Sequence, residues 1–309
     1  MKEHKAIVFG ANGFLGLNLC YWLLQNKFDV HAIGRQESFK GEGLFDVKNL
    51  EYSQMDLANK EAIGMLQLNS YSLIFVFAGK TGTTAGFEHY SEYVESNEIG
   101  LLSILDLYLK QKAKGRVVFP SSRLVYKGAQ GEMLKEDAEK EAKTVYAANK
   151  IACENYLYAY GNAFNIPYTI FRICVPYGQL IPGDYSYGTM GFMLNQAKKF
   201  QSISLYGKGE PSRTFSHVID ICTLIGELSQ LPDSKNRTFN IGSKDNYDLK
   251  TLAEKVAKRT NTTLQFKDWP EMDLAIESGD TMFDDSAIQE VFPYIYQGSI
   301  DLFIENLTI

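Results

Sequence analysis

The chain has 309 residues, and 31 Lys and Arg residues stand against 37 Asp and Glu residues, which gives a formal net charge of −6 at pH 7. Charged residues make up 22% of the chain and hydrophobic residues 45%, values that are typical of globular proteins and exclude a disordered or fibrous chain. The acidic balance argues against nucleic acid or an anionic membrane as a partner. The length allows about two domains, each with its own core.

Cysteine and histidine positions give no sign of a disulfide framework or a metal site. The four cysteines and four histidines show no paired or metal-ligand spacing, so we expect buried free thiols and no metal. The first apolar run, 6–9, is too short for the core of a signal peptide, and no window approaches the roughly 18 apolar residues of a membrane-spanning helix. We therefore expect a cytoplasmic protein that does not bind membranes.

The first half of the chain alternates short apolar runs with segments of helical periodicity. Runs of this kind are typical of strands that are buried on both faces of a sheet. The expected strands are 6–9, 30–33, 50–53, 73–77, 116–119 and 168–171, and the expected helices are 13–26, 58–68, 92–112 and 144–165. This alternation predicts an α/β fold with a doubly wound parallel sheet.

The alternation stops after residue 175. Glycine, proline and tyrosine crowd the segment 176–191, and helical patterns follow near 190–200 and 249–260. We therefore predict a first domain formed by 1–174 plus about 212–245. The remaining segments, about 175–211 plus 246–309, are expected to form a smaller α/β lobe that binds substrate.

A glycine-rich segment lies between the first expected strand and the first expected helix. Residues 10–16 read GANGFLG, in which the first glycine permits a tight turn, the second lets backbone amides approach a pyrophosphate, and the third lets the helix pack closely on the strand. An ordinary glycine-rich turn is the alternative, but this position favours a Rossmann-like dinucleotide-binding domain. The residues expected to bind the cofactor here are Gly10, Asn12, Gly13, Phe14, Leu15 and Gly16.

The residues after the second and third expected strands bear on the choice of cofactor. The carboxylate that usually binds the adenosine ribose is missing after 30–33, where Arg35 stands instead. A guanidinium can bind a 2′-phosphate, so we expect NAD(P) binding with a preference for NADP, although a solvated arginine is the alternative. Asp56 and Leu57 follow the third strand, where they can cap a helix or contact adenine.

A second constellation predicts proton transfer. Tyr146 and Lys150 form a YxxxK pattern, and residues at this spacing share one helix face, with Cβ atoms about 5–6 Å apart. A nearby ammonium lowers the pKa of a phenol from its usual value of about 10, so that tyrosine can act as a base toward a hydroxyl group. Ser121 and Ser122 follow the strand 116–119, at the sheet edge where such folds bind ligands. A helix cap or a serine turn is the alternative for these two residues.

Taken in order, these motifs resemble those of the extended short-chain dehydrogenases/reductases, specifically the NAD(P)-dependent epimerase/dehydratase family that acts on nucleotide sugars. The resemblance covers nearly the whole chain. It lies in residues 10–16, 77–79, 97, 121–126, 146–150, 172–178, 213–220 and 239–242.

The resemblance implies roles for particular residues. Ser122, Tyr146 and Lys150 would be catalytic, and Asn97 would support a proton relay to Lys150. Further cofactor contacts would come from Phe77, Ala78, Gly79, Tyr146 and Lys150, and substrate contacts from Lys80, Arg123, Val175 and Arg213. Arg213 would bind the diphosphate of the substrate, with a structural salt bridge as the alternative.

The implied activity is C4 epimerisation of a nucleotide-diphosphate sugar through a 4-keto intermediate. Arg123 and Leu124 stand where dehydratase-like members carry an Asp-Glu pair, which disfavours dehydration. Val175 also departs from the family, which commonly has asparagine there. An NADPH-dependent 4-ketoreductase of deoxysugar synthesis is the first alternative, and a non-catalytic NAD(P)-binding sensor or RNA-associated protein is the second.

The resemblance also implies a homodimer, built through the helices that contain Asn97 and Tyr146. Apolar residues of these helices would either form the interface or face the protein's own core. They are Leu101, Leu105, Ile151, Tyr156 and Tyr158.

Overall fold

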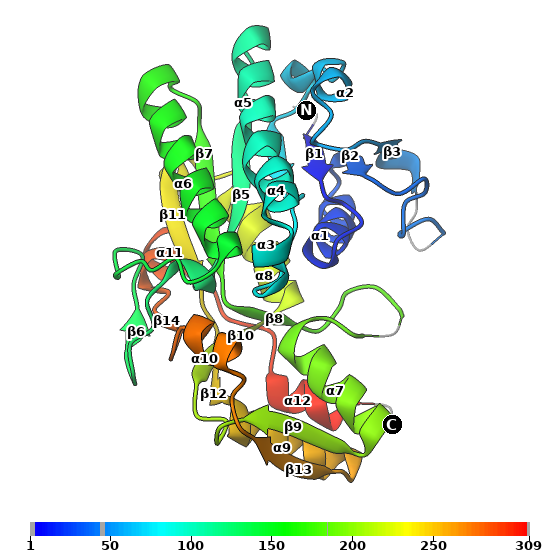
Figure 1. Ribbon diagram of the computed structural model, residues 1–309. Helices are drawn as coiled ribbons and strands as arrows, with labels where there is room; N and C mark the ends of the chain where they lie inside the picture. Colours follow the sequence, from blue (N-terminus) through cyan, green and yellow to red (C-terminus); the bar gives the residue numbers. More distant parts are fainter. Residues whose placement is uncertain (1–3, 44–46, 184, 308–309) are drawn as a thin grey trace. The chain divides into compact units, whose positions relative to one another are not determined.

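A computed structural model of the chain describes residues 4–43, 47–183 and 185–307 (Figure 1). The chain divides into two compact units. Unit 1 comprises Met1–Val125, Thr144–Arg172 and Cys222–Phe239, and unit 2 comprises Tyr126–Lys143, Ile173–Ile221 and Asn240–Ile309. Several segments that were expected in the first domain belong to unit 2 instead: 126–143, 173–174, about 212–221 and 240–245. The cofactor and substrate roles of the two domains stay predictions.

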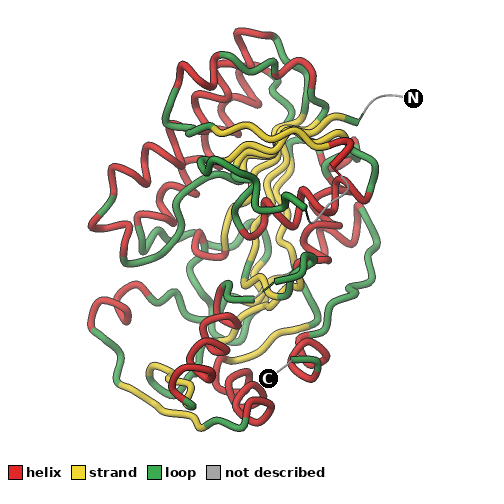
Figure 2. Tube along the Cα trace, turned by 90° about the vertical axis from the view of Figure 1, so that its right-hand side faces the viewer, coloured by secondary structure: helices red, strands yellow, loops and turns green. Residues whose placement is uncertain are grey.

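Unit 1 contains a seven-stranded sheet in the order β11-β7-β5-β4-β1-β2-β3, and the strand pairs from β3 across to β5 are parallel. Helices lie on both sides of its strands (Figure 2). The predicted Rossmann-like α/β class is therefore confirmed. The elements are β1 (Lys5–Phe9), α1 (Phe14–Gln25), β2 (Asp29–Gly34), η1 (Val47–Asn49), β3 (Leu50–Gln54), α2 (Lys60–Gly64), η2 (Leu68–Ser70), β4 (Leu73–Val76), α3 (Ala85–Glu88), α4 (Tyr90–Tyr93), η3 (Val94–Ile99), α5 (Gly100–Gln111), β5 (Arg116–Ser122), η4 (Arg123–Val125), α6 (Val145–Phe164), β7 (Tyr168–Ile173), α8 (Val218–Leu228), η5 (Pro232–Ser234) and β11 (Arg237–Ile241).

Apolar side chains of the central strands and of three helices form the main core of unit 1. Strands β1, β4 and β5 contribute continuous buried runs, as expected for strands covered on both faces. Helices α2, α5 and α6 pack against them in one buried cluster. Leu101 and Leu105 belong to this cluster and are fully buried, so they lie in the protein's own core and not on a free face.

Two helices differ from the expected pattern. The helix expected over 58–68 is α-helical only over α2, because the side chain of Gln111 accepts a hydrogen bond from Leu68 N and donates one to Leu66 O, which holds this stretch outside the helix. The helix expected over 92–112 is present as α4, η3 and α5, but η3 is a π-helical turn centred near Asn97. Such turns are frequent at functional sites.

Unit 2 consists of small sheets and helices. The sheets have the orders β12-β10-β8, β13-β9 and β14-β6, and residue 184, within the loop-rich stretch 176–191, lies outside the described residues. The elements are β6 (Met133–Leu134), β8 (Val175–Tyr177), α7 (Gly188–Phe200), β9 (Ser202–Tyr206), β10 (Ser212–His217), β12 (Asp245–Asp248), α9 (Leu249–Thr260), β13 (Thr263–Lys267), α10 (Glu271–Ile276), β14 (Met282–Phe283), α11 (Ser286–Val291) and α12 (Ile300–Glu305). In the described part of the chain, no helix combines the length and apolar character needed to cross a membrane.

Candidate functional site

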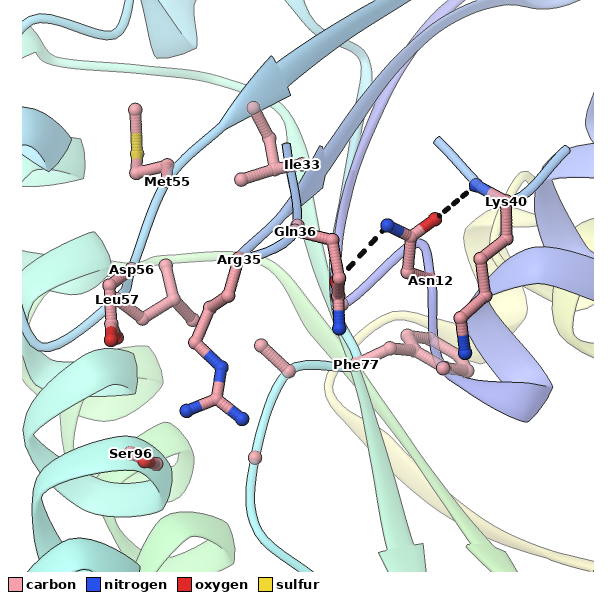
Figure 3. A pocket seen from close by; sticks show the side chains of 15 residues that line it. Asn12, Ile33, Arg35, Gln36, Lys40, Met55, Asp56, Leu57, Phe77 and Ser96 are labelled. Carbon is pink, nitrogen blue, oxygen red and sulfur yellow. Dashed lines mark hydrogen bonds between the residues drawn. The ribbon is translucent and has the colours of Figure 1, made fainter. Parts of the chain in front are cut away.

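A cavity of about 310 Å³ lies in unit 1 beyond the carboxyl ends of β1, β2 and β4 (Figure 3). After β1 the chain adds β2 and β3 on one side of it and then crosses to add β4 on its other side. The strand order therefore reverses at β1, and open α/β sheets bind their ligands in the crevice at such a point. The cavity is lined by Gly10, Asn12, Gly13, Ile33, Gly34, Arg35, Gln36, Lys40, Met55, Asp56, Leu57, Phe77, Ala78, Gly79 and Ser96.

The glycines of the 10–16 segment are required by the close approach of backbone atoms. Gly10 has φ +83°, and a Cβ there would lie 2.5 Å from the backbone nitrogen of Ala78. A Cβ at Gly16 would lie 2.2 Å from the carbonyl oxygen of Gly10. The turn therefore has no side chains at Gly10 and Gly13, where it lines the cavity at the start of α1. A pyrophosphate needs such close access to backbone N–H groups, so these residues fit a dinucleotide.

Asn12 organises the loop that follows β2. Its Nδ2 donates hydrogen bonds to Gln36 Oε1 at 3.0 Å and to Ser38 O at 2.9 Å, and its Oδ1 accepts one from the backbone N–H of Lys40 at 2.8 Å (Figure 3). Nδ2 also lies 3.2 Å from the hydroxyl oxygen of Tyr52. The buried side chain of Asn12 is thus used to hold the loop, which brings Gln36 and Lys40 to the cavity.

The cavity contains most, but not all, of the residues that the sequence predicted for cofactor binding. Phe14, Leu15 and Gly16 lie in the first turn of α1 and do not line it, nor do Tyr146 and Lys150. Six further residues line the cavity although no sequence motif predicted them: Ile33, Gly34, Gln36, Lys40, Met55 and Ser96. Lys40 could have been predicted, because it is a second basic residue in the loop after β2. Ser96 lies in η3, and nothing in its local sequence predicts that it lines the cavity.

Lys150 connects α6 to the end of β5. Its Nζ donates a hydrogen bond of 2.6 Å to the carbonyl oxygen of Pro120, lies 4.3 Å from the ring centroid of Phe119, and lies 5.7 Å from that of Tyr146. The side chain is buried, and this burial lowers the pKa of Lys150 to about 8, although Cys153 and Glu154 act in the opposite direction. The ammonium therefore lies against aromatic rings, with the Pro120 carbonyl as its hydrogen-bond acceptor among the described residues.

Ser122 and Tyr146 occupy the two elements that Lys150 joins. Ser122 is the last residue of β5, and its Oγ accepts a hydrogen bond from Leu124 N at 3.2 Å, which is the local serine turn considered as the alternative. Tyr146 lies in the first turn of α6, whose N-cap Thr144 accepts a hydrogen bond from Ala147 N. The structure thus brings the β5 end and the first two turns of α6 together, and the catalytic roles stay predictions.

Asn97 holds the segment that follows β4. Its Oδ1 accepts a hydrogen bond from Lys80 N at 2.7 Å, and its Nδ2 donates to Lys80 O at 3.1 Å and to Asn149 Oδ1 at 3.4 Å. Gly79 has φ +154°, and a Cβ there would lie 2.4 Å from Asn97 Oδ1. These hydrogen bonds join Asn97 to the turn after β4 and to Asn149 on α6, and a proton relay from Asn97 to Lys150 remains a prediction.

The residues predicted to bind substrate are engaged within their own units. In unit 1, Lys80 forms an ion pair with Glu92, and Arg123 begins η4. In unit 2, Val175 is buried in β8, where an apolar side chain offers no hydrogen bond.

The buried guanidinium of Arg213 pairs with the carboxylate of Glu277 at 2.5 Å and donates to the carbonyl oxygens of Ser212 and Gly279. This is the structural salt bridge considered as the alternative for Arg213, and a diphosphate contact of Arg213 stays a prediction.

Comparisons with known proteins agree with this geometry. The model of the "NAD dependent epimerase/dehydratase family" matches residues 6–242. The chain is 25% identical over 305 residues to an uncharacterized UDP-glucose epimerase, YtcB, of Bacillus subtilis, covering 94% of this chain and 92% of that protein. It is 26% identical over 250 residues to a UDP-glucuronate 4-epimerase of Thermodesulfobacterium geofontis, covering 80% and 70%. A UDP-glucose 4-epimerase of Thermotoga maritima, solved with UDP-glucose, superposes with a TM-score of 0.85 at 19% identity, covering 97% and 96%.

Proposed function

The chain belongs to the NAD-dependent epimerase/dehydratase family, and from this premise we propose that it is an NAD(P)-dependent nucleotide-sugar 4-epimerase. One structural observation carries the proposal. The buried Lys150 links the end of β5, which carries Ser122, to the first turns of α6, which carry Tyr146, and this supports a shared site at one edge of the sheet.

In the proposed reaction the cofactor, Tyr146 and Ser122 each have one role. A bound nicotinamide dinucleotide would supply the acceptance and return of hydride at the sugar C4. Tyr146, whose ring lies 5.7 Å from the Lys150 ammonium, takes the proton of the 4-hydroxyl group and later returns it to the 4-keto oxygen. Ser122 donates a hydrogen bond to that oxygen in both half-reactions. Because the hydride leaves from one face and returns to the other, the configuration changes with no net oxidation.

Relatives and residues both favour epimerisation over dehydration. Two relatives bear the name of a UDP-sugar epimerase. Loss of water needs a further acid/base pair, whereas Arg123 and Leu124 follow Ser122 in this chain. The nucleotide-diphosphate sugar as substrate therefore belongs to the proposal, and its base and sugar are left to experiment.

The test is product analysis with UDP-, dTDP-, GDP- and CDP-sugars. NMR should show conversion of one sugar to its C4 epimer without net change in absorbance at 340 nm. Tyr146→Phe should lower kcat by about 10²- to 10⁴-fold, the usual range for loss of an acid/base group, while the control Tyr160→Phe on the same helix keeps wild-type activity. Stoichiometric NADPH consumption with a 4-keto sugar nucleotide would instead show a ketoreductase, the alternative that the basic residues of the cavity favour.

We also propose that the cofactor is NADP. Two cationic side chains, Arg35 and Lys40, line the cavity on the loop after β2, where a 2′-phosphate would lie, and the end of β2 carries no carboxylate. Asp56 lines the cavity from the neighbouring β3–α2 connection.

Binding measurements with both dinucleotides test this preference. NADP should bind more tightly than NAD, and Arg35→Ala or Lys40→Ala should each weaken NADP binding by roughly ten- to a hundredfold, because a charge-assisted hydrogen bond contributes about 1.5–3 kcal/mol. NAD affinity should barely change, and Lys60→Ala, an exposed lysine outside the cavity, serves as the control. Tighter NAD binding by the wild-type protein would contradict the proposal.

A further inference from the structure

A fully buried ion pair lies one helical turn beyond Lys150. Glu154, on α6, and Arg172, on β7, are 0% and 1% exposed. The Arg172 Nε and Nη2 donate hydrogen bonds to the two carboxylate oxygens of Glu154, at 2.9 and 2.7 Å. A bidentate pair of this kind fixes the carboxylate in position as well as in charge. Neither residue takes part in the proton transfer proposed above.

The same carboxylate holds the end of β5. The hydroxyl of Ser121 donates a hydrogen bond of 2.6 Å to Glu154 Oε1, while the carbonyl of the preceding Pro120 accepts one from Lys150 Nζ. Two consecutive residues of β5 are thus attached to two residues of α6, and the next residue along the strand is Ser122. We call these two hydrogen bonds, Ser121 to Glu154 and Lys150 to Pro120, the tether. The tether fixes the position of the Ser122 hydroxyl relative to α6.

The helix periodicity aligns these groups. Tyr146, Lys150 and Glu154 are spaced four residues apart, so they share one face of α6. The anion of Glu154 is consequently the nearest carboxylate along that face to the buried ammonium, and it favours the charged form of Lys150. Lys150 also faces Tyr146 and Cys153 on α6 and Phe119 and Pro120 on β5. Two further charged groups act on these neighbours: Arg172 on β7 bonds Glu154, and Glu98 on η3 acts on Cys153 and bonds Asn149 and Tyr156.

We propose that Glu154 is a positioning residue for the Ser122–Tyr146–Lys150 site, acting through its hydrogen bond to Ser121 and through its charge on Lys150. This inference rests on the proposed function for its kinetic consequence. Its electrostatic consequence is a property of the folded chain and is measurable without substrate. Arg172 holds the carboxylate in place through its two hydrogen bonds.

The first experiment measures the titration of Lys150 directly. NMR of protein labelled with ¹³C at lysine Cε gives its midpoint, assigned by the resonance that is missing in Lys150→Arg. Glu154→Gln keeps the size of the side chain and removes the charge, so the midpoint should fall by about one pH unit, since a unit charge within about 10 Å, one turn away on the same helix face, contributes this at an effective dielectric constant of about 20. Glu95→Gln, an exposed carboxylate on the neighbouring η3, should leave the midpoint unchanged.

A second variant guards against loss of folding, because Glu154→Gln leaves the buried Arg172 cation without its carboxylate. The double variant Glu154→Gln/Arg172→Met removes both charges, and its midpoint should fall in the same direction by a smaller amount. A midpoint equal to that of the wild-type protein in a folded variant would overturn the electrostatic half of the inference.

The second experiment separates the tether from the charge. Ser121→Ala removes one hydroxyl and leaves the Glu154–Arg172 pair intact, so the protein should fold and the Lys150 midpoint should stay in place. Its kcat should nevertheless fall about tenfold, because a small displacement of a positioned group is costly in rate. A wild-type kcat in Ser121→Ala would overturn the tether. If the wild-type protein is inactive on every sugar nucleotide, the proposed function fails, and the Lys150 titration alone then decides this inference.

Discussion

Lys150 is a buried charge that lowers the free energy of unfolding of the chain. Its ammonium donates to Pro120 O, and burial lowers its pKa to about 8 from 10.5. Between these two pH values the unfolded chain binds more protons than the folded chain, so this group makes stability rise with pH there. Below pH 8 the full cost of burying the charged form is present. Burial of this ammonium beside Tyr146 therefore reduces the stability of the folded chain below pH 8.

Replacing this lysine should therefore stabilise the protein while inactivating it. At pH 7 we expect Lys150→Met to raise the free energy of unfolding by about 2 kcal/mol, the cost of burying the charge less one hydrogen bond. The gain should vanish near pH 10.5, where the unfolded lysine is also losing its proton. Urea unfolding at both pH values measures it.

The control for this prediction is Lys110→Met, which removes an exposed lysine paired with Asp106 on α5. Its effect on stability should be within about 0.5 kcal/mol at both pH values, as is usual for surface positions. If Lys150→Met were destabilising at pH 7, the ammonium would be better paired than its contacts indicate.

At the scale of elements, the first strand and helix depend on glycine as a packing device. A Cβ at Gly16 would lie 2.2 Å from Gly10 O, so α1 can approach β1 only with glycine there. Gly16→Ala should destabilise the protein by roughly 2–4 kcal/mol through overpacking and weaken dinucleotide binding. Thermal unfolding and a cofactor titration measure the two effects.

Gly64 is a matched comparison for this substitution. It lies in α2, and a Cβ at this position would have no described atom within 4 Å. Gly64→Ala should therefore stabilise the protein by about 0.5–1 kcal/mol through helix propensity. Destabilisation by both alanines would mean that close packing is not what distinguishes Gly16.

Elements set by local periodicity could be predicted from the sequence, whereas those set by long-range contacts could not. The buried runs of β1 and β4 and the capped α6 appear where they were expected. The early end of α2 depends on hydrogen bonds from Gln111, more than 40 residues away. A distant side chain of this kind leaves no periodic signal in the segment it holds.

The candidate site follows the same division. The glycine turn and the YxxxK spacing are local patterns, and the structure places the first at the cavity and the second beside the end of β5. The pairing of Arg213 with Glu277 joins residues 64 positions apart, so the sequence left two alternatives open. Lys40 reaches the cavity because Asn12 holds its loop, a tertiary effect that residue type alone does not reveal.

On the scale of the whole molecule, the two units are interleaved along the chain. Residues 222–239 return to unit 1 after the chain has passed through unit 2. They supply β11 at one edge of the seven-stranded sheet, and they contain Thr223, whose hydroxyl bonds the indole of Trp22. They also supply the acceptors for Arg116 at Leu228 O, Leu231 O and Ser234 Oγ. Unit 1 is therefore incomplete in any fragment that ends before this return.

This interleaving predicts how the chain can be divided. A fragment of residues 1–172 should not unfold cooperatively, because β7 becomes an open edge and the half-buried Arg116 loses its three acceptors. Unit 1 with flexible Gly/Ser linkers in place of 126–143 and 173–221, ending at residue 239, should regain cooperative unfolding and bind dinucleotide. Urea denaturation followed by circular dichroism distinguishes the two. Cooperative unfolding of 1–172 alone would show that the returning segment is dispensable, because the sheet would then be stable without β11 and its contacts.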